Sequence, residues 1–439
     1  MSTNKRSKSK PKGKTVAETV DKPTVGTDQS TLGQNEKKRQ TFFVRTIWTF
    51  VMIAGFFLTL AAGHSWCILL VLFCELMTFK ECIAVTTASS RAKNLPVNKF
   101  LNWYLVFTTI YYLNGLDVYK IILESNFSLL KPYTDLIIAI SSHHKFICYC
   151  LYVCGFIMFV SSLRKGYLKF QMASLCATHM ALLFIVFQAH LIINNIMTGL
   201  FWFLLPCGLV IVNDIFAYLC GITFGKTKLI EISPKKTLEG FLGAWFFTAI
   251  ASIILTRILS PYSYLTCPVN NNLLYSNYWN PPNNCELNPI FRSQTYNLNH
   301  VIFERLHITS ITIKPIYIHS LNLATFASLF APFGGFFASG LKRTFKVKDF
   351  GHSIPGHGGI ADRVDCQFLM GSFTNLYFET FISEKRFSIE TIVSTILLNL
   401  NNNDILTLTL QLLTTLRDRE VFDENTLNVA IDTISKLLN

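Results

Sequence analysis

The feature that most limits how this chain can fold is a series of long apolar stretches with almost no charged side chains. A helix needs about 20 consecutive apolar residues to cross the roughly 30 Å hydrocarbon core of a bilayer. Backbone polar groups in lipid must bond within their own segment, so such stretches predict helices. About nine of them follow one another: 47–63, 65–79, 100–122, 146–163, 170–188, 195–220, 238–257, 317–341 and 364–383. We therefore expect an all-α, polytopic integral membrane protein with about eight to nine transmembrane helices.

The composition agrees with a membrane protein and argues against nucleic acid as a partner. Hydrophobic residues make up 51% of the chain and charged residues only 15%, which is too apolar for an ordinary soluble protein. The net charge of +13 is concentrated in residues 1–46, where 11 Lys/Arg stand against 4 Asp/Glu and leave +7. This segment has almost no large apolar residue, which predicts a disordered basic cytoplasmic tail rather than a nucleic-acid-binding arm.

The cations of the short connections predict the topology. With the N-terminus in the cytoplasm, the connections 80–99, 164–169, 222–237 and 342–363 lie on the same side and hold 4, 3, 4 and 5 Lys/Arg. The opposite connections, 123–145 and 189–194, hold 2 and 0. Loops rich in Lys and Arg stay in the cytoplasm, so the counts support this threading. The side of the C-terminal tail depends on whether 364–383 crosses completely, which the sequence leaves open.

The long loop 258–316 is rich in Asn, Pro and Tyr and falls on the lumenal side in this threading. It contains Cys267 and Cys285. An oxidising lumen would allow these two cysteines to form a disulfide, and the sequence leaves open whether they do.

The segment from Ser339 to Asp365 holds most of the side chains that suit chemistry. Its cations favour a polyanionic ligand, because Lys and Arg form charge-assisted bonds to phosphate oxygens. The glycine-rich run 355–359 frees backbone N–H groups to face a ligand. Asp362 and Asp365 are three residues apart, so on a helix they share a face and could hold Mg²⁺ together with substrate phosphates. The alternative is that the cations only fix topology and that Asp362 pairs with Arg363 or its neighbours.

A second polar cluster begins at Asn213-Asp214, near the end of an apolar stretch, and continues to Gly240. Asp214 is a candidate for a further inward-facing carboxylate. Ser233, Lys235, Lys236 and Thr237 stand just before the stretch 238–257, where a helix N-terminus with cations favours an anion. Ser233 or Thr237 could instead simply cap that helix.

At these residues the sequence resembles the phosphatidate cytidylyltransferases (CDP-diacylglycerol synthases) of eukaryotes. The signature of that family combines a Ser, a Lys-Arg pair, Lys-Asp, Pro-x-His-Gly-Gly and Asp-Arg-x-Asp. The matching positions are Ser339, Lys342, Arg343, Lys348, Asp349, Pro355, His357, Gly358, Gly359, Asp362, Arg363 and Asp365. The segments around Asn213-Asp214 and Ser233–Gly240 are also similar to the eukaryotic members.

The resemblance implies an enzyme of the endoplasmic reticulum membrane that converts CTP and phosphatidic acid into CDP-diacylglycerol and pyrophosphate. It implies catalytic roles for Lys342, Arg343, Asp349, His357, Asp362 and Asp365, and substrate binding by Ser233, Lys235, Lys236, Thr237, Ser339, Lys348, Gly358, Gly359 and Arg363. Asp362 and Asp365 would bind Mg²⁺. Bacterial members tend to have an Asp where this chain has Gly335, so we take Asp214 as the candidate third ligand. A homodimer is a further expectation.

The chain is therefore expected to consist of the tail 1–46, a transmembrane catalytic domain 47–384 that includes the lumenal loop, and an amphipathic tail 385–439. A lipid phosphate is already nucleophilic near neutral pH, so catalysis reduces to positioning and charge neutralisation. Two other classes remain: a transporter of an anionic substrate, and a CTP-dependent polyprenol kinase. Only a cytidylyltransferase would pass the α-phosphate of CTP to a lipid.

Overall fold

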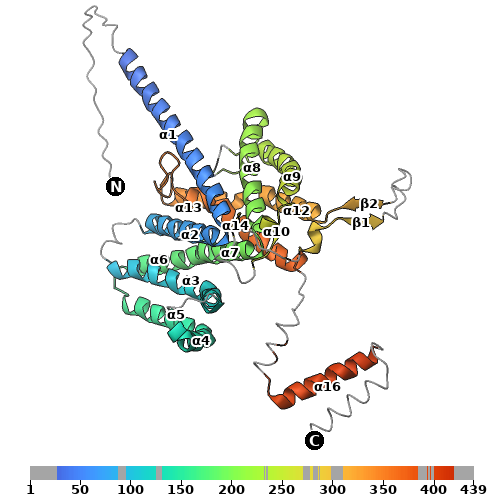
Figure 1. Ribbon diagram of the computed structural model, residues 1–439. Coiled ribbons are helices and arrows are strands. Elements are labelled where there is room, and N and C mark those ends of the chain that lie inside the picture. The colour runs from blue at the N-terminus through green and yellow to red at the C-terminus, as the bar shows by residue number, and fades with distance from the viewer. Residues whose placement is uncertain are drawn as a thin grey trace, which may run out of the picture. The chain divides into compact units, whose positions relative to one another are not determined.

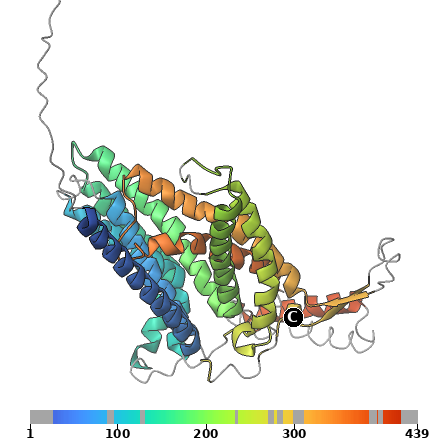
Figure 2. The ribbon, with the colours of Figure 1, turned by 90° about the horizontal axis from the view of Figure 1, so that it is seen from above.

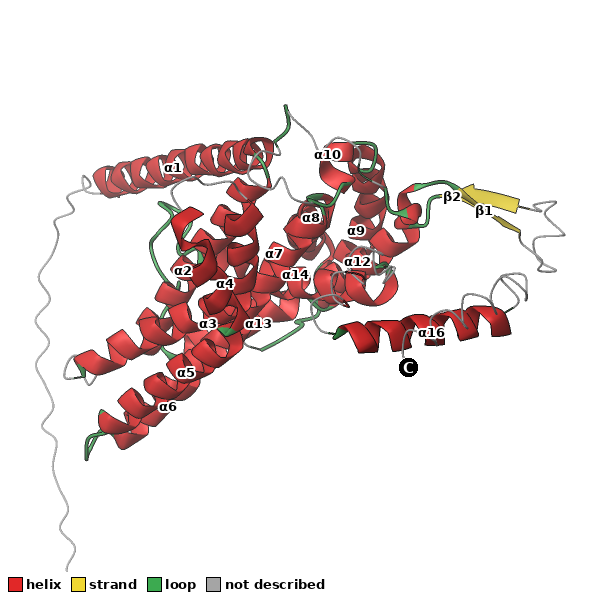
Figure 3. Ribbon diagram, turned by 60° about the horizontal axis from the view of Figure 1, so that its bottom comes forward, coloured by secondary structure: helices red, strands yellow, loops and turns green. Residues whose placement is uncertain are grey.

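The structure is a computed structural model that is almost entirely helical, with a single pair of short strands (Figures 1 and 3). It describes residues 27–87, 95–124, 131–231, 233, 236–269, 277–279, 285, 287–297, 310–383, 393, 396 and 400–419. Lys235, which was predicted to bind an anion, lies outside these residues, as does most of the predicted C-terminal tail 385–439. The chain divides into two compact units, Met1–Tyr377 and Phe378–Asn439.

Within the described residues, six helical segments are long and apolar enough to cross a membrane. They are Phe43–Ala62, His144–Ser161, Leu168–Thr198, Phe201–Phe224, Leu238–Leu259 and Ile316–Thr344. The chain is thus a multi-pass membrane protein by helix length and composition. The predicted stretches 65–79, 100–122 and 364–383 are also helical, but they are not among the six.

The first helices form one side of the larger unit. They are α1 (Thr27–Ala62), α2 (His64–Thr86), α3 (Pro96–Glu124), α4 (Thr134–Ser142) and α5 (His144–Ser161). Helix α1 begins at Thr27, so the structure has helix over part of the segment 1–46 that was predicted to be disordered. The residues Glu36–Gln40 there are mostly strong helix formers, and the apolar helix that follows supplies the nucleus from which helix can extend.

One predicted connection, 189–194, is wrong. Helix α6 (Leu168–Ala181), the π-helical turn η3 (Leu182–Phe187) and α7 (Gln188–Thr198) continue without a break through it. The polar side chains that suggested a loop find partners inside the protein: His190 Nδ1 lies 2.8 Å from Asn114 Oδ1 of α3. The chain turns instead at Gly199, whose φ of 139° favours glycine.

Helices α8 (Phe201–Phe224) and α9 (Leu238–Leu259) lie side by side (Figures 1 and 2). A Cβ atom added to Gly240 would stand 2.8 Å from the carbonyl oxygen of Ala217, so glycine is needed for this close approach. Helix α12 (Ile316–Leu329) packs against both. Helices α13 (Pro332–Thr344) and α14 (Ala361–Phe381) follow, and α16 (Asn402–Asp418) belongs to the smaller unit.

The loop between α9 and α12 contains the short helix α10 (Ser263–Thr266) and the antiparallel strands β1 (Gln294–Asn297) and β2 (Ser310–Ile313). A disulfide joins Cys267 to Cys285, which answers the question that the sequence left open. The Tyr264 hydroxyl donates a 2.5 Å hydrogen bond to the Leu60 carbonyl, so the loop is attached to the end of α1.

Candidate active site

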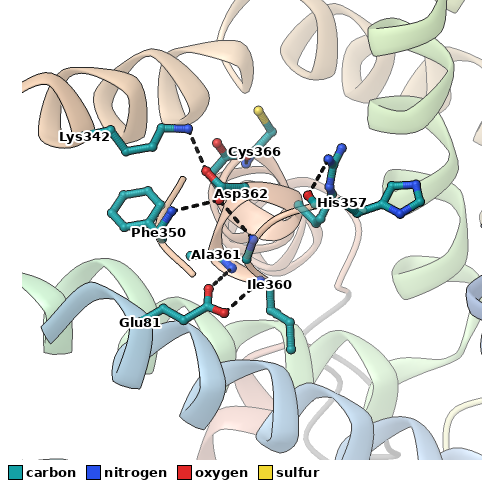
Figure 4. A network of polar contacts seen from close by, with 11 residues as sticks. Glu81, Lys342, Phe350, His357, Ile360, Ala361, Asp362 and Cys366 are labelled. Atoms are coloured by element: carbon teal, nitrogen blue, oxygen red, sulfur yellow. Dashed lines mark hydrogen bonds and ion pairs between the residues drawn. The ribbon is translucent and has the colours of Figure 1, made fainter. Parts of the chain in front are cut away.

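The N-terminal end of α14 is held by a carboxylate from a distant helix, as Figure 4 shows. Glu81 of α2 accepts hydrogen bonds from the backbone N–H groups of Ile360 (3.2 Å) and Ala361 (2.9 Å). It also accepts one from the Ser353 hydroxyl. The first N–H groups of a helix have no partner within the helix, and a negative charge there is favourable. Glu81 is 5% exposed and acts as a cap supplied by another element.

This cap explains two glycines of the loop before α14. Cβ atoms added to Gly351 and Gly359 would both overlap the Glu81 carboxylate. Side chains at these positions would push the carboxylate away from the helix end. The turn between them also contains Gly356 and Gly358, whose φ values of 76° and 85° are readily adopted only by glycine. The glycine-rich run therefore fits around a protein carboxylate.

Both carboxylate oxygens of Asp362 have partners within the protein. Its Oδ1 lies 2.6 Å from the Nζ of Lys342 on α13. Its Oδ2 accepts hydrogen bonds from the backbone N–H groups of Phe350 (3.0 Å) and Gly359 (3.2 Å). The two paired side chains are only 15% and 8% exposed. The neighbour that Asp362 pairs with is thus Lys342 and not Arg363. We call residues 359–362 with Glu81 and Lys342 the capped end of α14.

Asp365, one turn further along α14, has a different environment. It is half-buried and accepts a 2.8 Å hydrogen bond from the Cys366 backbone N–H. Its negative charge lies close enough to Asp214 of α8 for the two to repel each other, and Lys342 attracts it. We call Asp214 and Asp365 the carboxylate pair. The two polar clusters predicted from the sequence therefore meet in space.

Cations surround the carboxylate pair. Lys236, in the loop before α9, and Arg363, on α14, both interact electrostatically with Asp214. The Arg363 Nη2 atom also donates a 2.8 Å hydrogen bond to the His357 carbonyl. The interaction between Arg363 and Asp214 joins side chains that are well over a hundred residues apart in the sequence.

Gly335 of α13 faces Asp365 of the carboxylate pair. A Cβ atom added there would stand 3.3 Å from Asp365 Oδ2 and 3.1 Å from Cys366 Sγ. The position at which an Asp was expected from bacterial members is therefore adjacent to the Asp365 carboxylate. In this chain the glycine permits α13 to approach α14 closely.

Several other predicted site residues lie around this centre. Arg343 and Lys348 are exposed, near the C-terminal end of α13 and in the loop after it. Ser339 is half-buried on α13. Asp349 packs against Gly358: a Cβ atom added to Gly358 would stand 3.4 Å from the Cβ of Asp349. The His357 ring points to α1, where its Nε2 lies 3.2 Å from Thr49 Oγ1.

The predicted residues before α9 have mainly local contacts. Thr237 is the N-cap of α9, and its hydroxyl accepts a 3.3 Å hydrogen bond from the Gly240 N–H. This is the capping alternative that the sequence left open. The Ser233 carbonyl accepts a hydrogen bond from the Lys236 N–H at 3.0 Å, which forms a turn.

A magnesium ion fits Asp214 and Asp365, two of the three predicted ligands, better than it fits the third, Asp362. Both oxygens of Asp362 already have partners, whereas Asp214 and Asp365 are like charges held near each other, an arrangement that a cation stabilises. Among the described residues, no three His, Cys, Asp or Glu side chains form a metal-binding group. Mg²⁺ commonly uses only one or two carboxylates and completes its shell with water and substrate phosphates.

Sequence reasoning missed Glu81 and the contribution of α1. Glu81 stands at the end of an apolar stretch, where an acidic residue is unusual enough to suggest a role. Arg45 of α1 donates a 2.8 Å hydrogen bond from Nε to the Gly356 carbonyl, beside the contact between Thr49 and His357. Nothing in the local sequence around Arg45 indicates that contact.

Paired carboxylates with cations around them, at one helix end of a helical membrane protein, suit the binding of phosphate groups together with a metal ion. The profile of the cytidylyltransferase family matches residues 43–381, so the chain belongs to that family and is a nucleotidyltransferase. It is 68% identical over 382 residues to the phosphatidate cytidylyltransferase of Saccharomyces cerevisiae, covering 87% of this chain and 82% of that protein.

Similar proteins also occur in plants and animals. The chain is 40% identical over 369 residues to phosphatidate cytidylyltransferase 1 of Arabidopsis thaliana, with 84% of this chain and 86% of that protein covered. It is 41% identical over 344 residues to phosphatidate cytidylyltransferase 2 of Homo sapiens, with 78% and 75% covered.

Proposed function

We propose that this protein is a phosphatidate cytidylyltransferase, which makes CDP-diacylglycerol and pyrophosphate from CTP and phosphatidic acid. The identity of 68% with a yeast enzyme of that name supports the activity. The observation that carries the proposal on the structural side is the carboxylate pair with Lys236, Lys342 and Arg363 around it. Such a site suits a reaction between two phosphate-bearing substrates.

The reaction is a substitution at phosphorus. An oxygen of the lipid phosphomonoester forms a bond to the α-phosphorus of CTP. The bond from that phosphorus to the oxygen bridging the α- and β-phosphates breaks, and pyrophosphate leaves with the electron pair. The lipid phosphate is the nucleophile, so no side chain needs to become covalently attached.

The cations of the site hold both substrates in place. Arg363 and Lys236 flank Asp214 and can bind the lipid phosphate and the triphosphate. The exposed side chains of Arg343 and Lys348 are available for the outer phosphates. Lys342 interacts with both the capped end of α14 and the carboxylate pair, because it neutralises Asp362 and also attracts Asp365.

Magnesium is part of the proposal, with Asp214 and Asp365 as its protein ligands. Bound there, it would neutralise charge on the triphosphate and polarise the α-phosphate. Asp362 is assigned to building the site, because its oxygens are occupied by Lys342 and two backbone N–H groups.

The membrane arrangement is likewise proposed. Helices α2, α3 and α14 have 23, 29 and 21 residues, enough to cross the bilayer and to bring the count to nine. The disulfide in the loop after α9 favours an oxidising lumen at that end. The site lies at the other end of α9 and would face the cytoplasm. Residence in the endoplasmic reticulum and a homodimer are further expectations from the family resemblance.

The test uses purified protein in detergent micelles with phosphatidic acid, Mg²⁺ and CTP labelled at the α-phosphate. We expect label in the lipid product and unlabelled pyrophosphate. A polyprenol kinase would place label in the lipid only from γ-labelled CTP and only with a polyprenol acceptor. Folded protein that labels no phosphatidic acid under any of these conditions would refute the proposal.

A further inference from the structure

A pocket of about 350 Å³ opens between the end of α2 and the first turns of α3. Helix α6 packs against both of these helices (Figure 1). Well-packed protein interiors have few voids larger than a water molecule, whereas ligand pockets measure about 300–1,000 Å³. We call this space the α2–α3 pocket, and the residues that line it include Lys80, Ala84, Asn98, Lys99, Asn102 and Trp103.

Two lysines give the α2–α3 pocket a positive charge. Lys80 on α2 and Lys99 in the first turn of α3 line it, and both side chains are exposed. Neither forms an ion pair with a residue that the structure describes. The pocket also lies at the N-terminal end of α3, where the first backbone N–H groups of a helix favour an anion. These charges therefore suit a negatively charged ligand.

Two buried amide side chains of the pocket have unused hydrogen-bonding atoms. Asn98 is 6% exposed and Asn102 is 4% exposed. Within the described part of the chain, Asn98 Oδ1 and Asn102 Nδ2 have no hydrogen-bond partner. The Asn102 Oδ1 atom accepts a 2.9 Å hydrogen bond from the Thr178 hydroxyl, which leaves its Nδ2 for another partner. Because buried polar groups are nearly always hydrogen-bonded, these two atoms indicate a ligand with both a donor and an acceptor.

The remaining walls of the pocket are apolar and aromatic. They include Trp103 of α3, Phe170 of α6 and Ile83 of α2. The Trp103 ring packs edge-on against Phe79, with 5.9 Å between the ring centroids. Tryptophan is enriched where a membrane meets water, and basic pockets between membrane helices typically bind lipid head groups. Cations beside apolar walls therefore favour a phospholipid over a free ion.

Helix α2 separates this pocket from the active site. Lys80 and Ala84, four residues apart and so on one face of the helix, line the pocket. Glu81 and Val85, also four apart, face the other way: Glu81 caps α14, and Val85 packs in a cluster with Ala361. The pocket is thus a separate site on the opposite side of the helix that supplies the cap.

We propose that the α2–α3 pocket is a second, non-catalytic site, which binds the head group of an anionic phospholipid that carries hydroxyl groups. The lipid phosphate contacts Lys80 and Lys99. A head-group hydroxyl donates a hydrogen bond to Asn98 Oδ1, and Asn102 Nδ2 donates one to a head-group oxygen. This inference goes beyond the proposed function, and its test requires no turnover.

The test measures lipid binding by native mass spectrometry of the purified protein in detergent. The probe is dioleoyl phosphatidylglycerol, whose head group has a charged phosphate and two hydroxyls. Dioleoyl phosphatidylcholine, which has neither a net charge nor a hydroxyl, is the reference lipid. Each lysine near an anionic lipid contributes about fivefold in affinity. We therefore expect the double variant Lys80→Gln/Lys99→Gln to bind phosphatidylglycerol about 25-fold more weakly, with phosphatidylcholine binding unchanged.

The matched control is Lys165→Gln/Lys228→Gln, which removes the same charge from exposed positions outside the pocket lining. It should bind phosphatidylglycerol with nearly the wild-type affinity. An equal loss in both double variants would show non-specific attraction and overturn the inference. Ala84→Leu keeps both lysines but fills part of the pocket, so it should also weaken phosphatidylglycerol binding. Wild-type affinity in Ala84→Leu would overturn the inference too.

A competition experiment separates a lipid from a soluble phosphate. Free glycerol phosphate has the phosphate and the hydroxyls without acyl chains, and at a concentration equal to that of the lipid it should not displace phosphatidylglycerol. Displacement at equal concentration would assign the pocket to a soluble phosphate and overturn the lipid assignment.

Thermal unfolding in detergent provides a second measurement. A ligand that binds the folded state stabilises it, so phosphatidylglycerol should raise the unfolding temperature of the wild type more than phosphatidylcholine does. The variant Lys80→Gln/Lys99→Gln should lose this difference while unfolding at the wild-type temperature when no lipid is added. The same rise in both proteins would overturn the inference.

Discussion

The capped end of α14 and the carboxylate pair are one helical turn apart and differ in how their charges are satisfied. At the capped end, Glu81 and Asp362 accept hydrogen bonds from backbone N–H groups, and Lys342 neutralises Asp362. In the carboxylate pair, Asp365 and Asp214 repel each other. The first arrangement is complete within the protein. The second has cationic side chains near it but no hydrogen-bonded ion pair like that of Asp362 with Lys342, and a bound cation between the two carboxylates would reduce their repulsion.

This difference suggests a division of labour between two aspartates on one helix. A buried carboxylate with all its partners in place stabilises the geometry of a loop and has little capacity left for a ligand. A partly exposed carboxylate next to another one can bind a metal ion when substrate arrives. We therefore expect substitutions at the capped end to reduce stability, and substitutions in the carboxylate pair to reduce activity.

The largest expected effect is on catalysis in Asp365→Asn. Loss of one protein ligand for Mg²⁺ should lower kcat/KM by about 10³-fold, which corresponds to about 4 kcal/mol of transition-state stabilisation. The unfolding temperature should stay close to that of the wild type. Asp135→Asn, at an exposed position of α4, is the matched control and should have wild-type activity. Wild-type turnover in Asp365→Asn would remove this residue from the metal site.

The next effect is on stability and comes from the ion pair at the capped end. Asp362→Asn should destabilise the protein by about 3–5 kcal/mol, because Lys342 would remain half-buried without its counter-charge. Combining it with Lys342→Met should restore part of that loss. A double-mutant cycle based on thermal unfolding in detergent measures the coupling, and strictly additive effects would contradict the pairing.

Glu81→Gln should destabilise by a smaller amount, about 1.5–3 kcal/mol, since the amide keeps one acceptor oxygen but loses the charge at the helix end. Limited proteolysis of the loop before α14 should speed up in this variant. Glu231→Gln, at an exposed position, serves as the control. If cleavage in the loop is no faster than in the control, Glu81 does not hold the loop.

The smallest effect is expected for Thr49→Val, which removes one hydrogen bond between α1 and His357 without changing shape. The loss should be about 0.5–1.5 kcal/mol in stability, with activity reduced no more than threefold. Thr223→Val is the control, because its hydroxyl bonds within its own helix, to the Leu219 carbonyl. A loss of activity as large as that of Asp365→Asn would show that α1 contributes to the chemistry itself.

Local features of the sequence predicted the class of fold and a set of candidate residues for the site. The apolar stretches predicted helices at nearly the correct places, because hydrophobicity over about 20 residues is enough to identify a membrane span. The connection at 189–194 was wrong because His190 finds its partner on α3, a contact that cannot be seen in the sequence. The same reasoning could not separate Asp362 from Asp365, which have equivalent positions on one face of α14.

By itself, the sequence determined that this is a helical membrane protein of the cytidylyltransferase family, with its candidate residues in two clusters. These properties depend on composition and on motifs within short segments. Only the tertiary structure decided that the two clusters meet and that Lys342 forms an ion pair with Asp362. It also decided that Glu81 caps a helix whose first residue lies 280 positions further along the chain. Which carboxylate is free for a metal depends on partners brought together by packing, and packing is a property of the folded chain.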